Sequence, residues 1–504
     1  MARVNHLVLD GSVRRAGGGR VLVGGSPLIL LRLTAAGAAL IDRIPVGGTA
    51  GGTAGGTAGG EISGGATTEA LLDRLLDAGI VHPQLAGIVH PQLGGIPPHQ
   101  GAGDYLQAGD VTVVIPAFAT PLATLAAVVE ACAGVAAVVV VDDASPTPIC
   151  PVPGATVVRR TVNGGPGQAR TSGLEHVDTR LVAFVDSDVT PAPGWLDGLL
   201  GHFTDDRVAL VAPRVASATG PGALARFDSV RSPLDLGPAP ARVRAGTRVS
   251  YVPSAVMVAR VGALRAVGGF DPGLRVGEDV DLVWRLDEAG WRVRYEPAVT
   301  VQHAPRPSLM SWLRQRHQYG TSAAPLAAQH PGALAPVRVS GWSAASWLAV
   351  AAGWPVIGAT IAAGTTALLA GKLRTVPDGT RLALRLAGLG HLHAGRSLAS
   401  GVTRAWWPFA IAAALVSQRA RRAVLMAAVV PAAFDWWSTR PPLDPLTYVA
   451  LRNLDDVASG CGLWTGVIRT RSLDAIRPDL TSWPKPGRGR TRAAATPVQP
   501  PADR

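Results

Sequence analysis

The sequence predicts an α/β protein with a doubly wound sheet at its centre, and three observations lead to this prediction. Strand-like and helical segments alternate between residues 110 and 190. The run LVAFV at 181–185 is apolar without interruption, which is typical of a strand buried on both faces of a parallel sheet. Several of these strands end at Pro or Asp residues, which puts chemically useful groups at one edge of the sheet.

Residues 1–95 predict a small α+β domain that precedes this sheet. VNHLVLD and GRVLVGGSPLILLRL alternate as strands do, and LTAAGAALIDRI and TEALLDRLLDAGI carry apolar residues at helical spacing. Thr34 and Thr68 are expected as caps or first-turn residues of the two helices. Between the helices lies the glycine-rich tract 47–60, which cannot pack a core.

An octapeptide, AGIVHPQL, occurs at 78–85 and again at 86–93. Two copies do not make a solenoid, so we interpret both as surface insertions. His82 and His90 are then loop copies rather than metal ligands.

Residues 5–92 resemble the winged peptide-recognition domain of ribosomal-peptide modification systems. The resemblance rests on D-x-S-V-R-R, on G-G-R-V-L-V-G-G-S-P and on L-R-L-T-x-x-G. It implies that a precursor peptide binds by adding a strand to a sheet edge. The alternative is that this domain only caps the domain that follows.

After a Gly- and Pro-rich linker at 96–109, the predicted strands are VTVVIPAF, VAAVVVVDDAS, ATVVRRT and LVAFVDSDV. Pro116, Phe118 and two pairs of aspartates lie where these strands end, the pairs being Asp142 with Asp143 and Asp186 with Asp188. Two hard oxygen ligands after a buried strand suit a divalent cation that also holds a diphosphate. An Asp-rich turn is the alternative for D-x-D alone.

Seven ordered motifs between residues 110 and 335 resemble family 2 glycosyltransferases, which have the GT-A fold. They are VVIPAF, VVVDDAS, NGGPGQARTSGL, FVDSDV, GGFDPGL, GEDVDLVWRL and VQH. The resemblance implies a GT-A domain of the nucleotide-diphospho-sugar transferase type, a nucleotide-sugar donor, and Mg²⁺ or Mn²⁺ as cofactor.

On the donor side, Asp142 and Asp143 can accept hydrogen bonds from a nucleobase imide and a ribose. Pro116 and Phe118 lie at the same edge, and Phe118 offers an apolar face to the base or to the core. Gly165 belongs to a Gly-rich turn that opens a helix, so its backbone amides could face an anion. Arg170 would be a fixed cation beside the nucleotide.

On the metal side, Asp188, with Asp186 close by, is expected to hold the cation that neutralises the leaving diphosphate. By the resemblance, His303 in VQH adds a further metal or phosphate contact; alone it would be a structural histidine. Arg314, Arg316 and Tyr319 could also contact the diphosphate. The Q-x-x-R-W pattern of processive members is absent, so processivity stays open.

Direct displacement at the anomeric carbon inverts configuration and needs a carboxylate base for the acceptor hydroxyl. Glu278, Asp279 and Asp281 follow Gly277 at the start of a predicted helix, where acids are also favourable caps. By the family's catalytic segment, Asp279 is the base, Glu278 contacts the acceptor, and Asp281 is a helix residue.

Residues 336–480 are predicted to be apolar, helical and membrane-associated. Val339–Gly371 contains no charged residue and is long enough to span a bilayer, although Trp354–Pro355 interrupts it. Two shorter uncharged runs, 405–418 and 423–434, are separated by arginines. Buried helices of a soluble domain are the alternative. The Pro- and Arg-rich tail 481–504 is expected to be disordered.

The totals of the whole chain agree with a cytoplasmic site at a membrane. The formal charge is +12, only Lys372 and Lys485 are lysines, and 16% of the residues are charged. The mean hydropathy is +0.24. Such a balance suits nucleotide phosphates or anionic lipid, whereas no basic run with aromatics predicts nucleic acid binding. Three separated cysteines indicate a reducing compartment, and the N-terminus lacks the apolar core of a signal peptide. We expect the cell membrane, with the GT-A domain on its cytoplasmic side.

The combination of the three regions most resembles the glycosyltransferases of mycofactocin systems. It implies a peptide-derived redox cofactor as acceptor, UDP-glucose as donor, and an oligoglucoside as product. The alternative enzyme is a membrane glycosyltransferase with a lipid or cell-wall acceptor. A third hypothesis is a binding protein that keeps an inactive GT-A fold.

Overall fold

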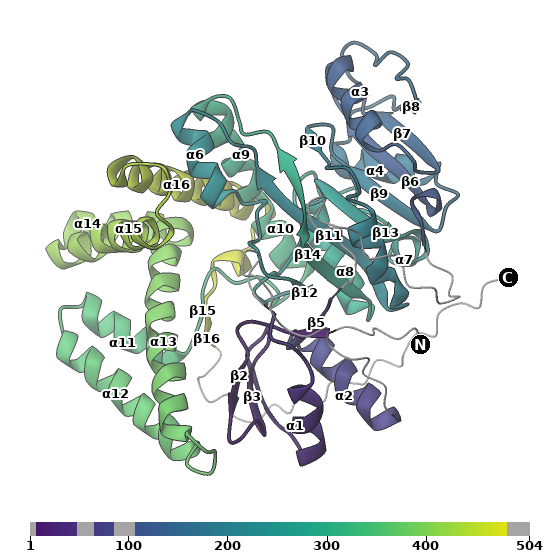
Figure 1. The fold of residues 1–504 in the computed structure, drawn as a ribbon. Helices are drawn as coiled ribbons and strands as arrows, with labels where there is room; N and C mark the ends of the chain where they lie inside the picture. The colour runs from purple at the N-terminus through teal and green to yellow at the C-terminus, as the bar shows by residue number, and fades with distance from the viewer. Residues whose placement is uncertain (1–6, 48–64, 85–105, 481–504) are drawn as a thin grey trace. The chain divides into compact units, whose positions relative to one another are not determined.

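The computed structural model describes residues 7–47, 65–84 and 106–480. The chain divides into two compact units. Figure 1 labels many of the helices and strands described below. The first contains Met1–Gly220 and Arg231–Pro305, and the second contains Pro221–Val230 and Arg306–Arg504. The glycine-rich tract from residue 48, the second octapeptide copy and the predicted disordered tail lie outside the described residues.

The N-terminal part of the first unit is built from short strands and two helices. They are β1 Leu7–Leu9, β2 Arg14–Ala16, β3 Val21–Gly24, β4 Ile29–Arg32, α1 Ala35–Asp42, α2 Ala66–Asp77 and β5 Val81–Pro83. β2, β3 and β4 form an antiparallel sheet, and β1 pairs with β5. As expected, Thr34 caps α1 by accepting a hydrogen bond from the Gly37 amide at 3.1 Å, and Thr68 lies in the first turn of α2.

The first octapeptide copy is not a surface insertion, contrary to the expectation from its duplication. It closes α2 and forms β5, and Ile80 and Val81 are fully buried in the N-terminal core. His82 is also buried, with its Nε2 3.0 Å from Asp10 Oδ2. Burial lowers the pKa of His82, although Asp10 opposes that shift.

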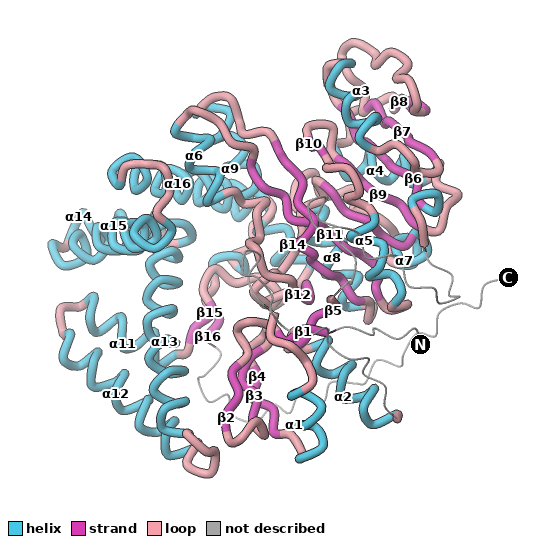
Figure 2. Tube along the Cα trace, viewed as in Figure 1, coloured by secondary structure: helices cyan, strands magenta, loops and turns pink. Residues whose placement is uncertain are grey.

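Within the described residues, the main sheet of the first unit has nine strands. They are β6 Val111–Ala117, β7 Ala137–Asp142, β8 Thr156–Arg159, β9 Leu181–Val185, β10 Val189–Thr190, β11 Val208–Ser217, β12 Ala241–Val243, β13 Val256–Arg260 and β14 Arg292–His303. The order is β10-β14-β11-β13-β9-β6-β7-β8, with β12 beside β14, and Figure 2 shows these strands in magenta.

The sheet is mixed, whereas the alternation of strands and helices predicts a parallel one. β8, β7, β6 and β9 are parallel to one another, as expected. β13 then runs antiparallel to both β9 and β11, and β14 returns parallel to β11. The parallel prediction therefore holds only for the four strands that the first motifs occupy.

The helices of this part are α3 Leu122–Ala131, α4 Pro166–Leu174, α5 Asp197–Leu200, α7 Val261–Ala266 and α8 Glu278–Glu288. Every residue of β6 and β9 is buried, so helices must cover both faces of the sheet. α4 lies so close to β6 that a Cβ on Gly173 would come within 2.3 Å of Val114. Glycine at this position therefore allows α4 to pack directly against the strand and fixes the Gly-rich turn before it.

Ion pairs of the buried Arg292 with partly exposed aspartates join the N-terminal elements to the main sheet inside the first unit. The Arg292 guanidinium on β14 donates to Asp77 at 2.8 Å and Asp73 at 3.0 Å, both on α2, and to Asp205 at 2.7 Å. Arg294, two residues further along β14, is fully buried, and its guanidinium nitrogens have no hydrogen-bond partner among the described residues. Burial lowers the pKa of Arg294 to about 9, and the neighbouring arginines add to that shift.

Helices dominate the second unit. They are α6 Ala223–Arg231, α9 Leu309–Thr321, α10 Ala323–Gln329, α11 Gly341–Ala351, α12 Pro355–Lys372, α13 Gly379–Ser400, α14 Trp407–Val416, α15 Gln418–Thr439 and α16 Pro445–Thr470. A parallel pair of two-residue strands, β15 Arg338–Val339 and β16 Asp479–Leu480, accompanies them. α9 and α16 pack so closely that a Cβ on Gly462 would lie 1.9 Å from the His317 carbonyl oxygen, so only glycine fits there.

The uncharged run Val339–Gly371 does not form one long helix. It is divided between α11 and α12, with the break before Pro355, which takes the first position of α12. In the described part of the chain, no helix combines the length and the apolar character that crossing a bilayer requires.

Candidate active site

The carboxyl ends of β6, β7 and β9 meet at one edge of the sheet, which brings the predicted strand-end residues together. The register places Ala117 beside Asp142 across β6 and β7, and Val114 beside Phe184 across β6 and β9. The turn after β9 carries Asp186 and Asp188. The prediction that these residues share one edge therefore agrees with the register of the strands.

Asp188 and His303 lie side by side, although 115 positions separate them in the sequence. The short strand β10 pairs antiparallel with the end of β14, and its register sets Val189 opposite His303. His303 Nε2 is 3.4 Å from Asp188 Oδ2. The Asp188 side chain is 42% exposed and that of His303 is 12% exposed, so the pair is accessible to a ligand.

Arg170 is fixed, as expected, but it is buried and both of its terminal nitrogens are bound to carboxylates of the protein. One guanidinium nitrogen donates to Asp186 Oδ1 at 2.5 Å and the other to Glu278 Oε1 at 3.0 Å. The side chain is 1% exposed and lies over the Phe270 ring at 5.6 Å. Arg170 thus connects the turn after β9 with the first turn of α8.

Burial raises the pKa of the Glu278 carboxyl to about 7, and the negative charge of Asp279 adds to that shift while Arg170 opposes it. Glu278 is buried, so its carboxyl is held in the wall of the site. Burial likewise raises the pKa of Asp186, with Arg170 opposing the shift.

Asp279 is the second residue of α8, after Glu278, and is only partly buried. Its Oδ2 accepts a hydrogen bond from the Ser254 amide at 3.0 Å, and its Oδ1 accepts one from the Val280 amide at 2.8 Å. These donors fix the carboxylate, while burial raises the pKa of Asp279 above its ordinary value. Asp281, by contrast, pairs with Arg285 one turn later on the same helix.

Asp142 and Asp143 are both held by the protein. Asp142 is fully buried and accepts hydrogen bonds from the amides of Ser145 at 2.8 Å and Ile149 at 3.1 Å. Burial alone would raise the pKa of Asp142, but these bonds outweigh it and lower the pKa. Asp143 accepts from the amides of the Gly-rich turn, Gly164 at 3.0 Å and Gly165 at 2.7 Å.

The amino-acid sequence of this chain is similar to those of known proteins. The family model described as Glycosyl transferase family 2 matches residues 112–260. The chain is 40% identical over 494 residues to the protein named Pre-mycofactocin glycosyltransferase in two strains of Mycobacterium tuberculosis, covering 94% of this chain and 97% of each relative. The chain belongs to glycosyl transferase family 2. It is a glycosyltransferase, and its mixed sheet with flanking helices is a GT-A fold.

Among solved structures, a crystal structure of GalNAc-T7 with UDP, GalNAc and Mn2+ is 16% identical, covers 42% of this glycosyltransferase and 50% of its own chain, and has a TM-score of 0.31. Both the identity and the TM-score are too low for this structure to support an argument about the site.

Pro116 and Phe118 occupy different environments in this glycosyltransferase. Pro116 is buried within β6, whereas Phe118, just past the end of the strand, is 51% exposed. Ala119 follows with φ of +52°, and its amide donates to Ser145 Oγ at 2.9 Å. The bend therefore presents the Phe118 ring outward at the site edge.

Two contributors to the site were absent from the sequence-based set. Arg160, just after β8, forms an ion pair with Asp143, with its Nε 2.9 Å from Oδ1, and donates hydrogen bonds to Gln168 on α4, so it stabilises the Gly-rich turn. Phe270, in GGFDPGL, packs edge-to-face on Phe184 and supports Arg170. Arg160 could have been predicted as a site residue, because it is a basic residue that directly follows the parallel strand β8.

Arg316 has a structural environment within the second unit of this glycosyltransferase. It is buried and donates to Asp228 at 2.6 Å, with Asp455 at 3.1 Å from its Nε. Its guanidinium is also stacked on Trp312 at 4.9 Å. Arg314 is exposed and Tyr319 is half-buried on the same helix.

Proposed function

We propose that this glycosyltransferase transfers glucose from UDP-glucose to pre-mycofactocin, a peptide-derived redox cofactor precursor, and repeats the transfer to build an oligoglucoside. The observation that carries the acceptor is the 40% identity to a Pre-mycofactocin glycosyltransferase across 94% of this chain. Since the match extends over almost the whole chain, it includes regions on both sides of the GT-A domain.

The donor is assigned to the edge where β6, β7 and β9 end. The exposed Phe118 ring offers a stacking face for the nucleobase. The amides of Gly164 and Gly165, which were expected to face an anion, instead donate to Asp143 and shape the Gly-rich turn. A diphosphate at this edge would therefore meet the positive end of α4 without these two amides. Asp142 is assigned to stabilising the loop of Ser145 and Ile149, because its carboxylate oxygens already accept hydrogen bonds from the amides of these residues.

A divalent cation fits the side chains of Asp188 and His303, with Asp186 nearby. The described residues contain no group of three His, Cys, Asp or Glu side chains arranged to hold a metal ion. Two protein ligands leave room for the oxygens of a diphosphate and water. An imidazole nitrogen beside carboxylate oxygens suits Mn²⁺ better than Mg²⁺, which prefers oxygen ligands. When bound, such an ion neutralises charge that develops on the leaving group.

Asp279 is assigned as the general base. Its carboxylate takes the proton from an acceptor hydroxyl as that oxygen bonds to the anomeric carbon and the bond from that carbon to the diphosphate breaks. Attack from the face opposite the leaving group inverts the configuration. The amides of Ser254 and Val280 hold the carboxylate in one orientation, so its proton-accepting geometry is set before the acceptor binds.

Glu278 and Arg170 are assigned as positioning residues. Arg170 bonds Asp186 on the donor side and Glu278 on the acceptor side, so it sets the distance between the two turns. Glu278 is buried and its carboxylate is bound by Arg170, which favours support of the base over a direct contact with the acceptor.

The N-terminal elements are assigned to recruitment of the peptide-derived acceptor. In β2, β3 and β4, the outer strands β2 and β4 each pair only with β3 among the described residues, so each offers an edge for strand addition. The Arg292 ion pairs fix these elements to the GT-A sheet. Recruitment therefore predicts a change in the acceptor KM when the edge is blocked.

The test is an assay of purified enzyme with UDP-glucose and pre-mycofactocin, read by mass spectrometry of the acceptor. The expected result is a series of products that differ by one anhydrohexose. Transfer to lipid or cell-wall acceptors but not to pre-mycofactocin would establish the alternative enzyme. Binding of pre-mycofactocin without donor hydrolysis or transfer would instead establish an inactive scaffold.

A further inference from the structure

Three helices of the second unit have almost all of their side chains exposed or half-buried; α12 and α14 are apolar throughout, and α15 is mainly apolar after the arginines at its start. α12 has 18 residues, of which only Gly358 is buried; α14 has 10 residues, none of them buried; α15 has 22 residues, of which only Ala432 is buried. A helix that is apolar all round is normally buried in a core or in lipid. We call α12, α14 and α15 together the apolar helix surface.

The exposed side chains of this surface are large. Val356 on α12 is 77% exposed and Leu415 on α14 is 75% exposed. Several more lie on the same three helices: Ile357, Leu368, Phe409, Ile411, Val416, Leu425, Met426, Val429, Val430, Phe434 and Trp437. Exposed apolar patches of this extent mark a surface that another apolar phase covers.

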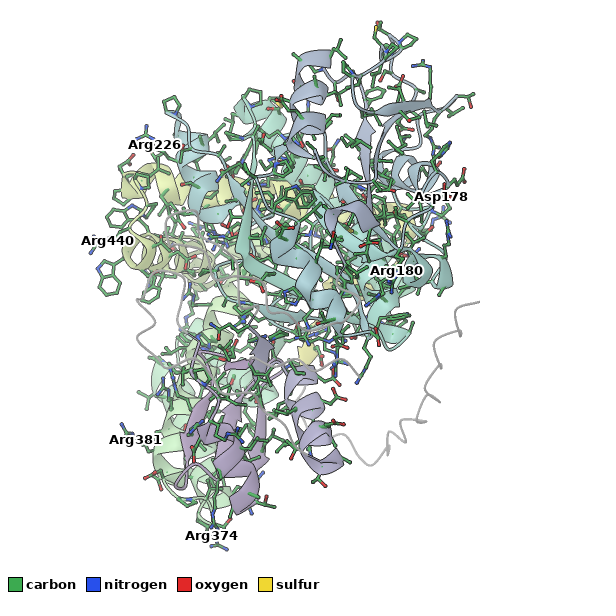
Figure 3. All side chains as sticks on the ribbon, turned by 45° about the vertical axis from the view of Figure 1, so that its right-hand side comes forward. Asp178, Arg180, Arg226, Arg374, Arg381 and Arg440 are labelled. Atoms are coloured by element: carbon green, nitrogen blue, oxygen red, sulfur yellow. The ribbon has the colours of Figure 1, made fainter. Side chains whose placement is uncertain are left out.

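The charges around the apolar helix surface are almost all positive. Residues 339–443 contain ten Lys or Arg residues, two Asp residues and no Glu. The basic residues are Lys372, Arg374, Arg381, Arg385, Arg396, Arg404, Arg419, Arg421, Arg422 and Arg440. Two of these cations are neutralised by ion pairs, Arg396 by Asp435 and Arg404 by Asp455 and Asp456 of α16, so eight basic residues remain against Asp378. Figure 3 shows Arg374, Arg381 and Arg440 pointing away from the ribbon.

A groove in the same region could take an alkyl chain. It has a volume of about 740 Å³ and lies between α11, α12 and α13. Small residues of α12, among them Gly358, Ala359, Ala362 and Ala363, form one wall, and Leu384 and Leu392 of α13 form another. A second cavity of about 520 Å³ shares His391 with it and includes Lys372. An apolar groove beside a cation matches an acyl chain with an anionic head group.

We propose that the apolar helix surface binds the surface of a bilayer that contains anionic lipid. The apolar side chains would enter the boundary between head groups and acyl chains, while the surrounding arginines meet the lipid phosphates. α14 has 10 residues and is about 15 Å long, half of a hydrocarbon core, so it suits the interface plane. A second copy is disfavoured as the partner, because two such surfaces would carry like charges.

This attachment would hold the enzyme on the leaflet to which basic segments are drawn, the cytoplasmic one. It is independent of the acceptor, since it concerns helices outside the GT-A sheet. Failure of the vesicle test below would leave sugar transfer in solution unaffected, and failure of transfer to pre-mycofactocin would leave vesicle binding unaffected.

The test uses the full chain and vesicle flotation. One set of vesicles contains equal parts of phosphatidylglycerol and phosphatidylcholine, and the other contains phosphatidylcholine alone. The expected result is flotation with the first set only, with binding lost as salt is raised. Val356→Asp with Leu415→Asp should weaken binding at least about tenfold, since two apolar side chains would carry charge into the boundary. Arg421→Gln with Arg422→Gln should weaken it by a comparable factor of about ten or more.

The matched control is Leu446→Asp. Leu446 is 81% exposed on α16, so the substitution is chemically equal but lies outside the apolar helix surface. It should leave vesicle binding within about twofold of the wild-type value. Circular dichroism checks that each variant is folded, and the arginine pair removes no apolar contact.

Absence of flotation with the anionic vesicles would overturn the proposal, as would equal flotation with phosphatidylcholine alone. A dimer in analytical ultracentrifugation that Val356→Asp and Leu415→Asp dissociate, without vesicle binding, would overturn it in favour of a second copy.

Discussion

The Asp279→Asn variant is the most informative perturbation of the site. In the wild type, Asp279 accepts hydrogen bonds from the Ser254 and Val280 amides, one on each carboxylate oxygen. Asparagine has the same shape and retains an oxygen for one amide, but its nitrogen cannot accept the other hydrogen bond. It also cannot take a proton from the acceptor hydroxyl.

The two losses differ in size and appear in different constants. A missing general base lowers kcat by about 10²–10⁴-fold, which corresponds to roughly 3–5 kcal/mol of transition-state stabilisation. One lost backbone hydrogen bond costs about 0.5–1.5 kcal/mol and acts on stability. The affinity for UDP should therefore change by less than about tenfold, while turnover collapses.

The assay measures kcat with pre-mycofactocin and the dissociation constant of UDP by calorimetry. Asp281→Asn is the control, because Asp281 lies on the same helix but pairs with Arg285. This control should lower the melting temperature. The kcat of the folded variant should stay within about threefold of the wild-type value, since the base stays in place. A loss of UDP affinity in proportion to the loss of kcat in Asp279→Asn would show that Asp279 is structural.

Four further predictions follow from the structure. Asp188→Ala, or EDTA on the wild type, should lower transfer by several orders of magnitude; full activity at verified zero metal would exclude a cation. Because burial raises the pKa of Asp279, kcat should fall as pH drops through that raised value, and Asp279→Asn should lose this acidic limb; a retained limb would assign it to another group. Arg294→Met should raise the unfolding free energy by about 1–4 kcal/mol in urea titration, as it removes an unpaired buried charge; destabilisation would show that Arg294 has a partner. Arg292→Met should lower the free energy of unfolding by about 1.5–3 kcal/mol, because hydrogen bonds to carboxylates that are 15–39% exposed are lost; a neutral result would mean that water replaces them fully.

Local signals predicted much of this structure correctly. Thr34 caps α1 as its position before an apolar-periodic segment indicates, and the break before Pro355 separates α11 from α12. The strand-end aspartates share an edge, because parallel strands end at the same side of a sheet. These features depend on residues a few positions apart, which is the range that periodicity and capping rules describe.

Long-range partners could not be predicted. His82 is buried because Asp10, 72 positions earlier, pairs with it across β1 and β5. Both carboxylate oxygens of Asp142 accept hydrogen bonds from amides of the loop that follows it. Its position at the end of a strand predicted a contact with the donor and gave no sign of this role in the loop. No sequence motif indicates that β13 runs antiparallel to β9. The apolar composition of α12 predicts a buried helix, whereas most of its side chains are exposed, which a further binding partner would explain.

The most direct test of the whole account is NMR of the product formed from UDP-α-glucose and pre-mycofactocin by the purified wild-type enzyme. The anomeric proton of the new glucosyl group reports both that transfer occurred and with which configuration. The account predicts a β-glucoside on pre-mycofactocin, formed with inversion by the Asp279 base. An α-glucoside would contradict the mechanism, and unmodified pre-mycofactocin beside an enzyme that glycosylates another acceptor would contradict the proposed function.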